Sequence, residues 1–194
     1  MEMSRMGALM GCLSSIIFTL SWVISAMLWG NWTLGSNSLS DIGVCGVVSA
    51  EMVFNAGCMI TGVLVLFLAL ALIIDDNIWF RMSGIAAMIS GFACFAIGII
   101  NENYGDIHMT VAGIYGGFAA ATIALSGAGD FIEERRPFTL LAAVLLLICA
   151  LSSRIHPFGV FEPIAVSCIL IWTFIQSAIL YDKNTKEGVS GNGH

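Results

Sequence analysis

The sequence predicts an all-α, polytopic membrane protein, a single bundle of six transmembrane helices. Of its 194 residues, 58% are hydrophobic and only 10% are charged, and the mean hydropathy is +0.94. A soluble domain carries about 25% charged residues. Six apolar runs also approach the roughly 20 residues that cross about 30 Å of hydrocarbon. They cover residues 8–30, 49–74, 79–100, 107–128, 138–154 and 162–181.

Each run is expected to be a helix, because backbone N–H and C=O groups in lipid must be satisfied within the segment. The first run exceeds the apolar core of a signal peptide, and Trp29-Gly30-Asn31 is a poor cleavage site, so we expect a retained span. The six spans form one domain over residues 1–183. The polar, Gly-rich residues 184–194 are predicted to be a disordered cytoplasmic tail.

The positions of Lys and Arg predict the orientation. Only Arg154 falls on one side of the predicted membrane, and the other basic residues all fall on the opposite side. These are Arg5, Arg81, Arg135, Arg136, Lys183 and Lys186. The positive-inside rule therefore predicts a multi-pass protein of the plasma membrane with both termini in the cytoplasm.

The remaining charges exclude nucleic acid as a partner, because no basic stripe is present. Carboxylates in the cytoplasmic connections are interpreted as solvated loop charge: Asp75, Asp76, Asp130, Glu133 and Glu134. The six cysteines form no disulfide framework. All but Cys45 fall inside predicted spans, where Cys packs as a small apolar residue.

The connection after the first span, from Asn31 to about Ala50, is long and only partly polar. One interpretation is a second helix that begins at Asp41 and continues to Ile74, which would be roughly 50 Å long. Alternatively, Gly43 and Gly46 break it into a short outer helix and the span proper. Asn31-Trp32-Thr33 is a glycosylation sequon on the predicted outer side.

Small residues predict where helices touch. Gly84, Gly91 and Gly98 repeat every seven residues on the third span, and Gly113 and Gly117 form a GxxxG pattern on the fourth. Such faces let helix backbones approach closely. We expect them to pack within the bundle, with homo-oligomer formation through the same faces as the alternative.

Unusual polar residues gather on the predicted outer side. If the second helix begins at Asp41, then Asp41, Glu51 and Asn55 lie within an arc of roughly 80°. His108 opens the fourth span, above a small and polar stripe that should face the bundle. Ionisable groups at membrane depth normally face a cavity or pair with one another. Ser38 and Asp41 also fit a helix capping box, which needs no function.

These residues are the candidate site. The candidates for catalysis are His108 as base or ligand, Asp41 or Glu51 to orient it, and Ser40 as a hydrogen-bonding group. The candidate ligand-binding residues are Asn37, Glu51, Asn55, Glu102, Asp106 and Tyr115. A His/carboxylate metal set would draw on His108, His156, Asp41 and Glu162, although no metal-ligand spacing motif occurs. The sequence implies no cofactor.

The stretch NSLSDIG at 37–43, FNAG at 54–57, the Gly-bearing third span and the lone His108 resemble a known family. It is the family of membrane proteins catalogued as domain-of-unknown-function family 998. More loosely, the chain is similar to Frag/DRAM-type six-helix proteins, some of which act in remodelling of lipid anchors. The resemblance implies six helices and supplies no mechanism.

Three hypotheses follow for the function. The first is a site open to the outer leaflet that binds or processes a lipid or a small polar molecule. The second is a small-solute or cation transporter, whose path would use Thr19, Ser90, Thr122, Ser126 and Gln176. The third is a structural or partner-binding protein, in which the polar cluster only pins the second helix to the fourth.

Overall fold

The computed structural model describes residues 2–155 and 157–191, and it describes side chains throughout that part except at 155 and 184–191. Six long helices of the described chain are apolar enough to cross a membrane, as predicted. Their bounds are α1 Glu2–Trp29, α2 Val48–Ile73, α3 Ile78–Ile97, α4 Asp106–Ile132, α5 Arg136–Ile155 and α6 Phe158–Gly191. Two short 3₁₀ helices, η1 (Ser40–Val44) and η2 (Glu102–Tyr104), lie in the connections.

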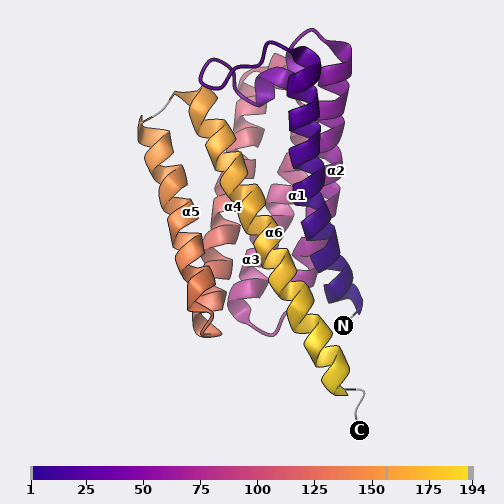
Figure 1. Cartoon of the computed structure of the whole chain (residues 1–194), viewed down its shortest axis with the longest axis vertical. Helices are drawn as coiled ribbons and strands as arrows, with labels where there is room; N and C mark the ends of the chain where they lie inside the picture. Colours follow the sequence, from indigo (N-terminus) through magenta and orange to yellow (C-terminus); the bar gives the residue numbers. More distant parts are fainter. Residues whose placement is uncertain (1, 156, 192–194) are drawn as a thin grey trace.

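Consecutive helices pack side by side from α1 to α4, and α6 returns to pack on α1. Helix α5 lies at one edge of the bundle, against α4 and α6 (Figure 1). By contrast, α4 and α6 touch only slightly. This loose pairing leaves room inside the bundle between α4 and α6.

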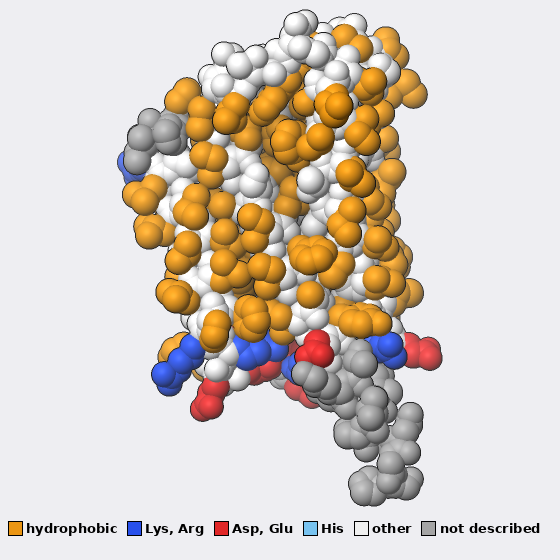
Figure 2. Space-filling view, in the orientation of Figure 1, with side chains coloured by type: hydrophobic (Ala, Val, Ile, Leu, Met, Phe, Trp, Pro, Cys, Tyr) orange, Lys and Arg blue, Asp and Glu red, His pale blue; other side chains and the backbone are white. Residues whose placement is uncertain are grey.

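The bundle has two unlike ends. Both termini lie at one end (Figure 1), which we call the terminal end and which includes residues 75–77 and 133–135. The opposite end, the loop end, holds connections 30–47 and 98–105. Figure 2 shows hydrophobic side chains over the flank and most visible Lys, Arg, Asp and Glu at the terminal end. An apolar flank between polar ends suits a protein surrounded by lipid.

Glycines on α3 make a close helix contact with α2, as the seven-residue repeat predicts. A Cβ on Gly84 would lie 2.7 Å from the Ile73 nitrogen, and one on Gly91 would lie 3.1 Å from the Gly62 oxygen. Gly98 meets α2 in the same way, at Asn55 and Met59. This face is therefore occupied within the chain, and homo-oligomer formation would need another surface.

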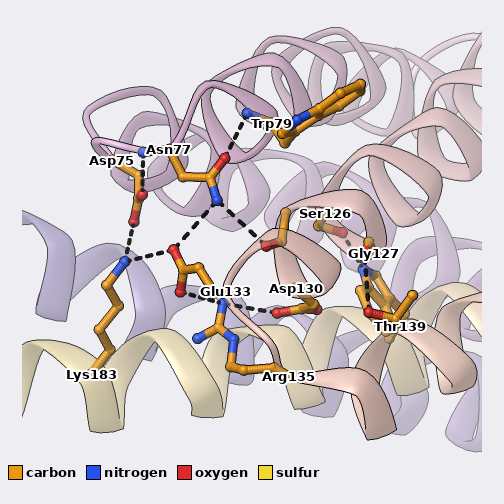
Figure 3. Close-up of polar contacts among 12 residues, drawn as sticks. Asp75, Asn77, Trp79, Ser126, Gly127, Asp130, Glu133, Arg135, Thr139 and Lys183 are labelled. Carbon is orange, nitrogen blue, oxygen red and sulfur yellow. Dashed lines mark hydrogen bonds and ion pairs between the residues drawn. The ribbon is translucent and has the colours of Figure 1, made fainter.

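An ion-pair network closes the terminal end (Figure 3). Lys183 Nζ lies 3.2 Å from both Asp75 Oδ2 and Glu133 Oε1. Arg135 lies 2.8 Å from Asp130 Oδ1 and 3.1 Å from Glu133 Oε2. The Asp130 side chain is fully buried, and that of Asp75 is only 7% exposed. The interpretation of these two carboxylates as solvated loop charge is wrong, because their partners come from α6 and the α4–α5 turn.

The predicted tail begins within α6, whose backbone is helical to Gly191. Residues 192–194 lie outside the described part of the chain. A disordered tail over 184–194 therefore stays a prediction. The orientation of the two ends in the membrane also stays a prediction.

Candidate functional site

The connection after α1 folds into a compact cap over the loop end. Ser38 Oγ accepts a hydrogen bond from the Asp41 backbone N–H at 3.1 Å, and Asp41 Oδ2 accepts one from the Ser38 N–H at 2.8 Å. This reciprocal pair has the hydrogen bonds of a capping box and lies at the start of η1, whose N-cap residue is Leu39. The expected pairing of Ser38 with Asp41 is thus confirmed.

The single long helix from Asp41 is wrong, and the broken alternative is correct. Gly46 has a φ of +81°, which side-chain-bearing residues rarely adopt, and α2 begins only at Val48. Asp41 consequently shares no helix with Glu51 and Asn55, and the predicted 80° arc does not exist. Glu51 Oε1 instead accepts from the Gly46 N–H at 2.6 Å.

Two side chains fasten this cap to the bundle. Glu162 Oε2, in the second turn of α6, accepts from the Leu39 N–H at 2.6 Å and lies 3.4 Å from the Ser40 nitrogen. Asn55 Nδ2, on α2, donates to the Gly43 carbonyl at 3.1 Å. Ile42 is fully buried beneath the cap. The cap therefore connects α2 and α6 at the loop end.

A cavity of about 290 Å³ lies beneath the cap. Its wall is mostly apolar and comes from α1, α2, α3, α4 and α6, whereas no described residue of α5 lines it. Phe18, Phe54, Phe158 and Phe161 are among the lining residues. Ligand sites in proteins are typically apolar clefts with a few placed polar groups, and this cavity has that form.

The glycines of α4 open the cavity instead of packing against a helix. Gly113, Gly116 and Gly117 all line it, and a Cβ on any of them would find nothing within 4 Å. Gly113 and Gly117 are also exposed, so the cavity reaches the bundle surface beside α4. The expectation that the GxxxG pattern makes a helix contact is therefore wrong.

His108 supplies the most buried polar group of the cavity wall, with 2% of the residue exposed. Its Nδ1 lies 2.7 Å from the Ile100 carbonyl oxygen. A carbonyl only accepts, so Nδ1 carries a proton and, in the neutral ring, Nε2 is the acceptor. Nε2 has no hydrogen-bond partner among the described residues. The group that orients His108 is thus a backbone carbonyl, in place of the expected Asp41 or Glu51.

Three carboxylates gather at the polar side of the cavity. Glu162 lines it, and Ser40, which also lines it, donates toward Glu102 Oε1 at 3.3 Å. Burial, together with the neighbouring Asp41, raises the pKa of Glu102 to about 7, against the opposing effect of the Ser40 hydroxyl. All Lys and Arg ion pairs of the described side chains lie at the terminal end. The carboxylates of this group, Asp41, Glu102 and Glu162, therefore lack a basic partner there.

The structure brings together only part of the predicted site. Ser40, His108 and Tyr115 line the cavity. Glu102 contacts Ser40, and Asp41 neighbours Glu102, but neither carboxylate lines the cavity itself. The other candidates stand apart from the cavity. Asn37 accepts a hydrogen bond from the Thr33 N–H, and its Nδ2 lies 3.4 Å from Asp41 Oδ2. Glu51 and Asn55 bind backbone groups of the cap. Asp106 is exposed in the first turn of α4.

No three His, Cys, Asp or Glu side chains of the described residues are placed to hold one metal ion. His108 and Glu162 line the cavity, and Asp41 does not. His156 lies outside the described residues. The metal set therefore stays a prediction that the described geometry does not favour.

Sequence reasoning missed two parts of the site. Glu162 was named only as a metal candidate, yet it both lines the cavity and holds the cap. Its place in an apolar segment, directly before Pro163, was an available signal. The second part is the glycine set of α4, whose sequence pattern is the same for a helix contact and for an open wall.

The comparisons with known proteins bear on the fold and not on an activity. No curated protein and no solved structure matches the chain, so the similarity to Frag/DRAM-type proteins stays a resemblance. One family model, described as "Protein of unknown function (DUF998)", matches residues 12–178. This range includes the cap, the cavity and all six spans in whole or in large part. The chain belongs to the DUF998 family.

Proposed function

We propose that this protein binds a single-chain amphiphile from the bilayer in the cavity beneath the cap. The apolar wall would take the chain, and the polar side at Ser40, His108 and Glu162 would take the head group. The observation that carries the proposal is the glycine wall of α4, which leaves space where a helix contact would otherwise form. The volume lies at the lower end of ligand sites, roughly 300–1,000 Å³, so we favour one chain over a two-chain lipid.

Binding is better supported than catalysis. Ser40 Oγ lies 3.1 Å from Ser38 Oγ and 3.3 Å from Glu102, and neither His108 nitrogen is bonded to it in the described residues. A nucleophile normally has its general base within hydrogen-bond reach. We therefore assign Ser40 and His108 to head-group binding.

The transporter hypothesis has weaker support. A second cavity, of about 40 Å³, shares Tyr115 in its wall with the first and is also lined by Thr122. The hydroxyls expected along a path are bonded to backbone carbonyls, however: Ser90 to Tyr115, Thr122 to Phe118, and Ser126 to Thr122. Each of these hydroxyls uses its proton on a carbonyl, which leaves only oxygen lone pairs for a passing solute, and the volume of this second cavity is small.

The binding proposal is tested by filling the cavity. Gly116→Leu places a side chain in open space and should abolish saturable labelling by dodecyl probes that carry a diazirine in the chain. Amine, alcohol and carboxylate forms of the probe cover the possible head groups. Wild-type protein in nanodiscs should be labelled at lining residues by at least one form.

Ala124→Leu is the matched control, because Ala124 is exposed on the same helix and does not line the cavity. It should label like wild type. The binding proposal fails if no probe labels wild-type protein saturably, or if Gly116→Leu labels as wild type does.

A further inference from the structure

We infer that the head group taken by this cavity is a cationic amine. The inference rests on the proposed function, since it names the chemical class of the ligand for the same site. It follows from the kinds of atom that face the polar side of the cavity and from where the basic residues of the chain lie.

The polar side chains in question are acceptors. Glu162 offers carboxylate oxygens, and the neutral His108 ring offers Nε2, which is unpartnered among the described residues although the side chain is almost fully buried. With no partner among the described residues, this nitrogen can accept a hydrogen bond from a molecule in the cavity. A ligand that donates hydrogen bonds would satisfy it, and an ammonium group is such a donor.

Charge gives the same answer. Glu102 and Asp41 stand behind Ser40, and Glu162 lies in the wall, so three carboxylates share one region. The raised pKa of Glu102 reflects burial together with negative charge that nothing nearby compensates. At the terminal end, in contrast, Arg135 and Lys183 neutralise a similar number of carboxylates. A bound cation would supply the compensating positive charge at the loop end, as Arg135 and Lys183 do at the terminal end.

The aromatic wall fits the same class of ligand. Phe158 and Phe161 of α6 both line the cavity, and their ring centroids lie 6.2 Å apart. Phe158 lies one turn before Glu162, and Phe161 directly precedes it. The face of an aromatic ring attracts cations, most strongly where water is excluded. An anionic head group would meet repulsion from the carboxylates, and a neutral alcohol would gain only hydrogen bonds.

The test is competition against the saturably bound probe by dodecylamine, dodecanol and dodecanoate. These share one chain and differ only in the head group. We expect dodecylamine to displace the probe at concentrations at least about tenfold below dodecanol, with dodecanoate weakest. Glu162→Gln keeps an acceptor oxygen for the cap while it removes the charge, and Glu102→Gln removes charge without touching the cap backbone.

Both variants should reduce the preference for dodecylamine by about tenfold and leave dodecanol unchanged. Glu51→Gln neutralises a loop-end carboxylate away from the cavity, and it should keep the wild-type preference. Glu102→Gln keeps the test decisive if Glu162→Gln fails to fold.

The outcomes separate the two proposals. Equal or stronger displacement by dodecanol or dodecanoate overturns the amine inference and leaves amphiphile binding intact. A dodecylamine preference that survives in every folded charge variant also overturns the inference. Absence of any saturable probe binding overturns the proposed function itself.

Discussion

Glu102 shows how burial and like charge combine at a single residue. It follows α3 in a short connection, yet its carboxylate is half-buried beside Ser40 and Asp41. Burial and the neighbouring carboxylates raise its pKa from 4.5 to about 7. The protonated form can donate to Asp41, whereas the ionised form adds another negative charge to an acidic region.

This shift makes stability depend on pH. Because the folded-state pKa exceeds the unfolded value, the stabilising contribution is complete below about pH 4.5 and is lost as the pH rises through about 7. Glu102→Gln mimics the protonated form at every pH. We expect its free energy of unfolding to exceed that of wild type by about 1 kcal/mol near pH 8, after allowance for solvent screening. At acid pH the two proteins should be equally stable.

Thermal unfolding in detergent measures this effect. Asp106→Asn, an exposed carboxylate on the next turn of chain, serves as the control and should lack the pH-dependent gain. Equal unfolding temperatures of wild type and Glu102→Gln at alkaline pH would contradict the assigned cause.

At the scale of elements, glycine has two opposite roles in neighbouring helices. On α3, Gly84 lets the backbone approach α2, and any added side chain meets backbone atoms. On α4, Gly116 faces the cavity and meets nothing within 4 Å. The first role fixes the packing of α2 on α3, and the second makes room for a ligand.

Alanine substitutions at these two glycines should therefore change the stability of the protein in opposite directions. In Gly84→Ala the new Cβ would lie 2.7 Å from the Ile73 nitrogen and 2.8 Å from the Ala69 oxygen, and overpacking of this kind costs about 1–3 kcal/mol. Gly116→Ala should stabilise the protein by about 0.5–1 kcal/mol, since alanine is the better helix former. The unfolding temperatures of the two variants in the same detergent test this prediction. If both substitutions raise the unfolding temperature, or both lower it, the two glycines do not have opposite roles.

On the scale of the whole molecule, charge is sorted between two ends. The terminal end holds acids and bases in mutual ion pairs (Figure 3), and the loop end holds carboxylates without a basic partner among the described side chains. The positive-inside rule predicts that the basic end faces the cytoplasm. The proposed cavity would then lie in the outer half of the membrane.

Thiol labelling of intact cells tests this orientation. Ser36→Cys introduces an exposed thiol at the loop end, and Asp76→Cys introduces one at the terminal end. Both are made with Cys45→Ser, because Cys45 is a partly exposed loop-end thiol. A membrane-impermeant maleimide should label only the Ser36→Cys variant before lysis and both variants after it. The reverse pattern would invert the predicted topology.

The sequence by itself determined the six helices, because length and hydropathy alone decide whether a segment can cross hydrocarbon. It also determined the sorting of charge and the burial of His108 on the inward stripe of α4. Only the tertiary structure decided that Gly46 ends the cap, that Glu162 reaches Leu39 from α6, and that the glycines of α4 border empty space. Those features depend on which side chains from distant parts of the chain meet, and hydropathy along one span carries no information about its neighbours.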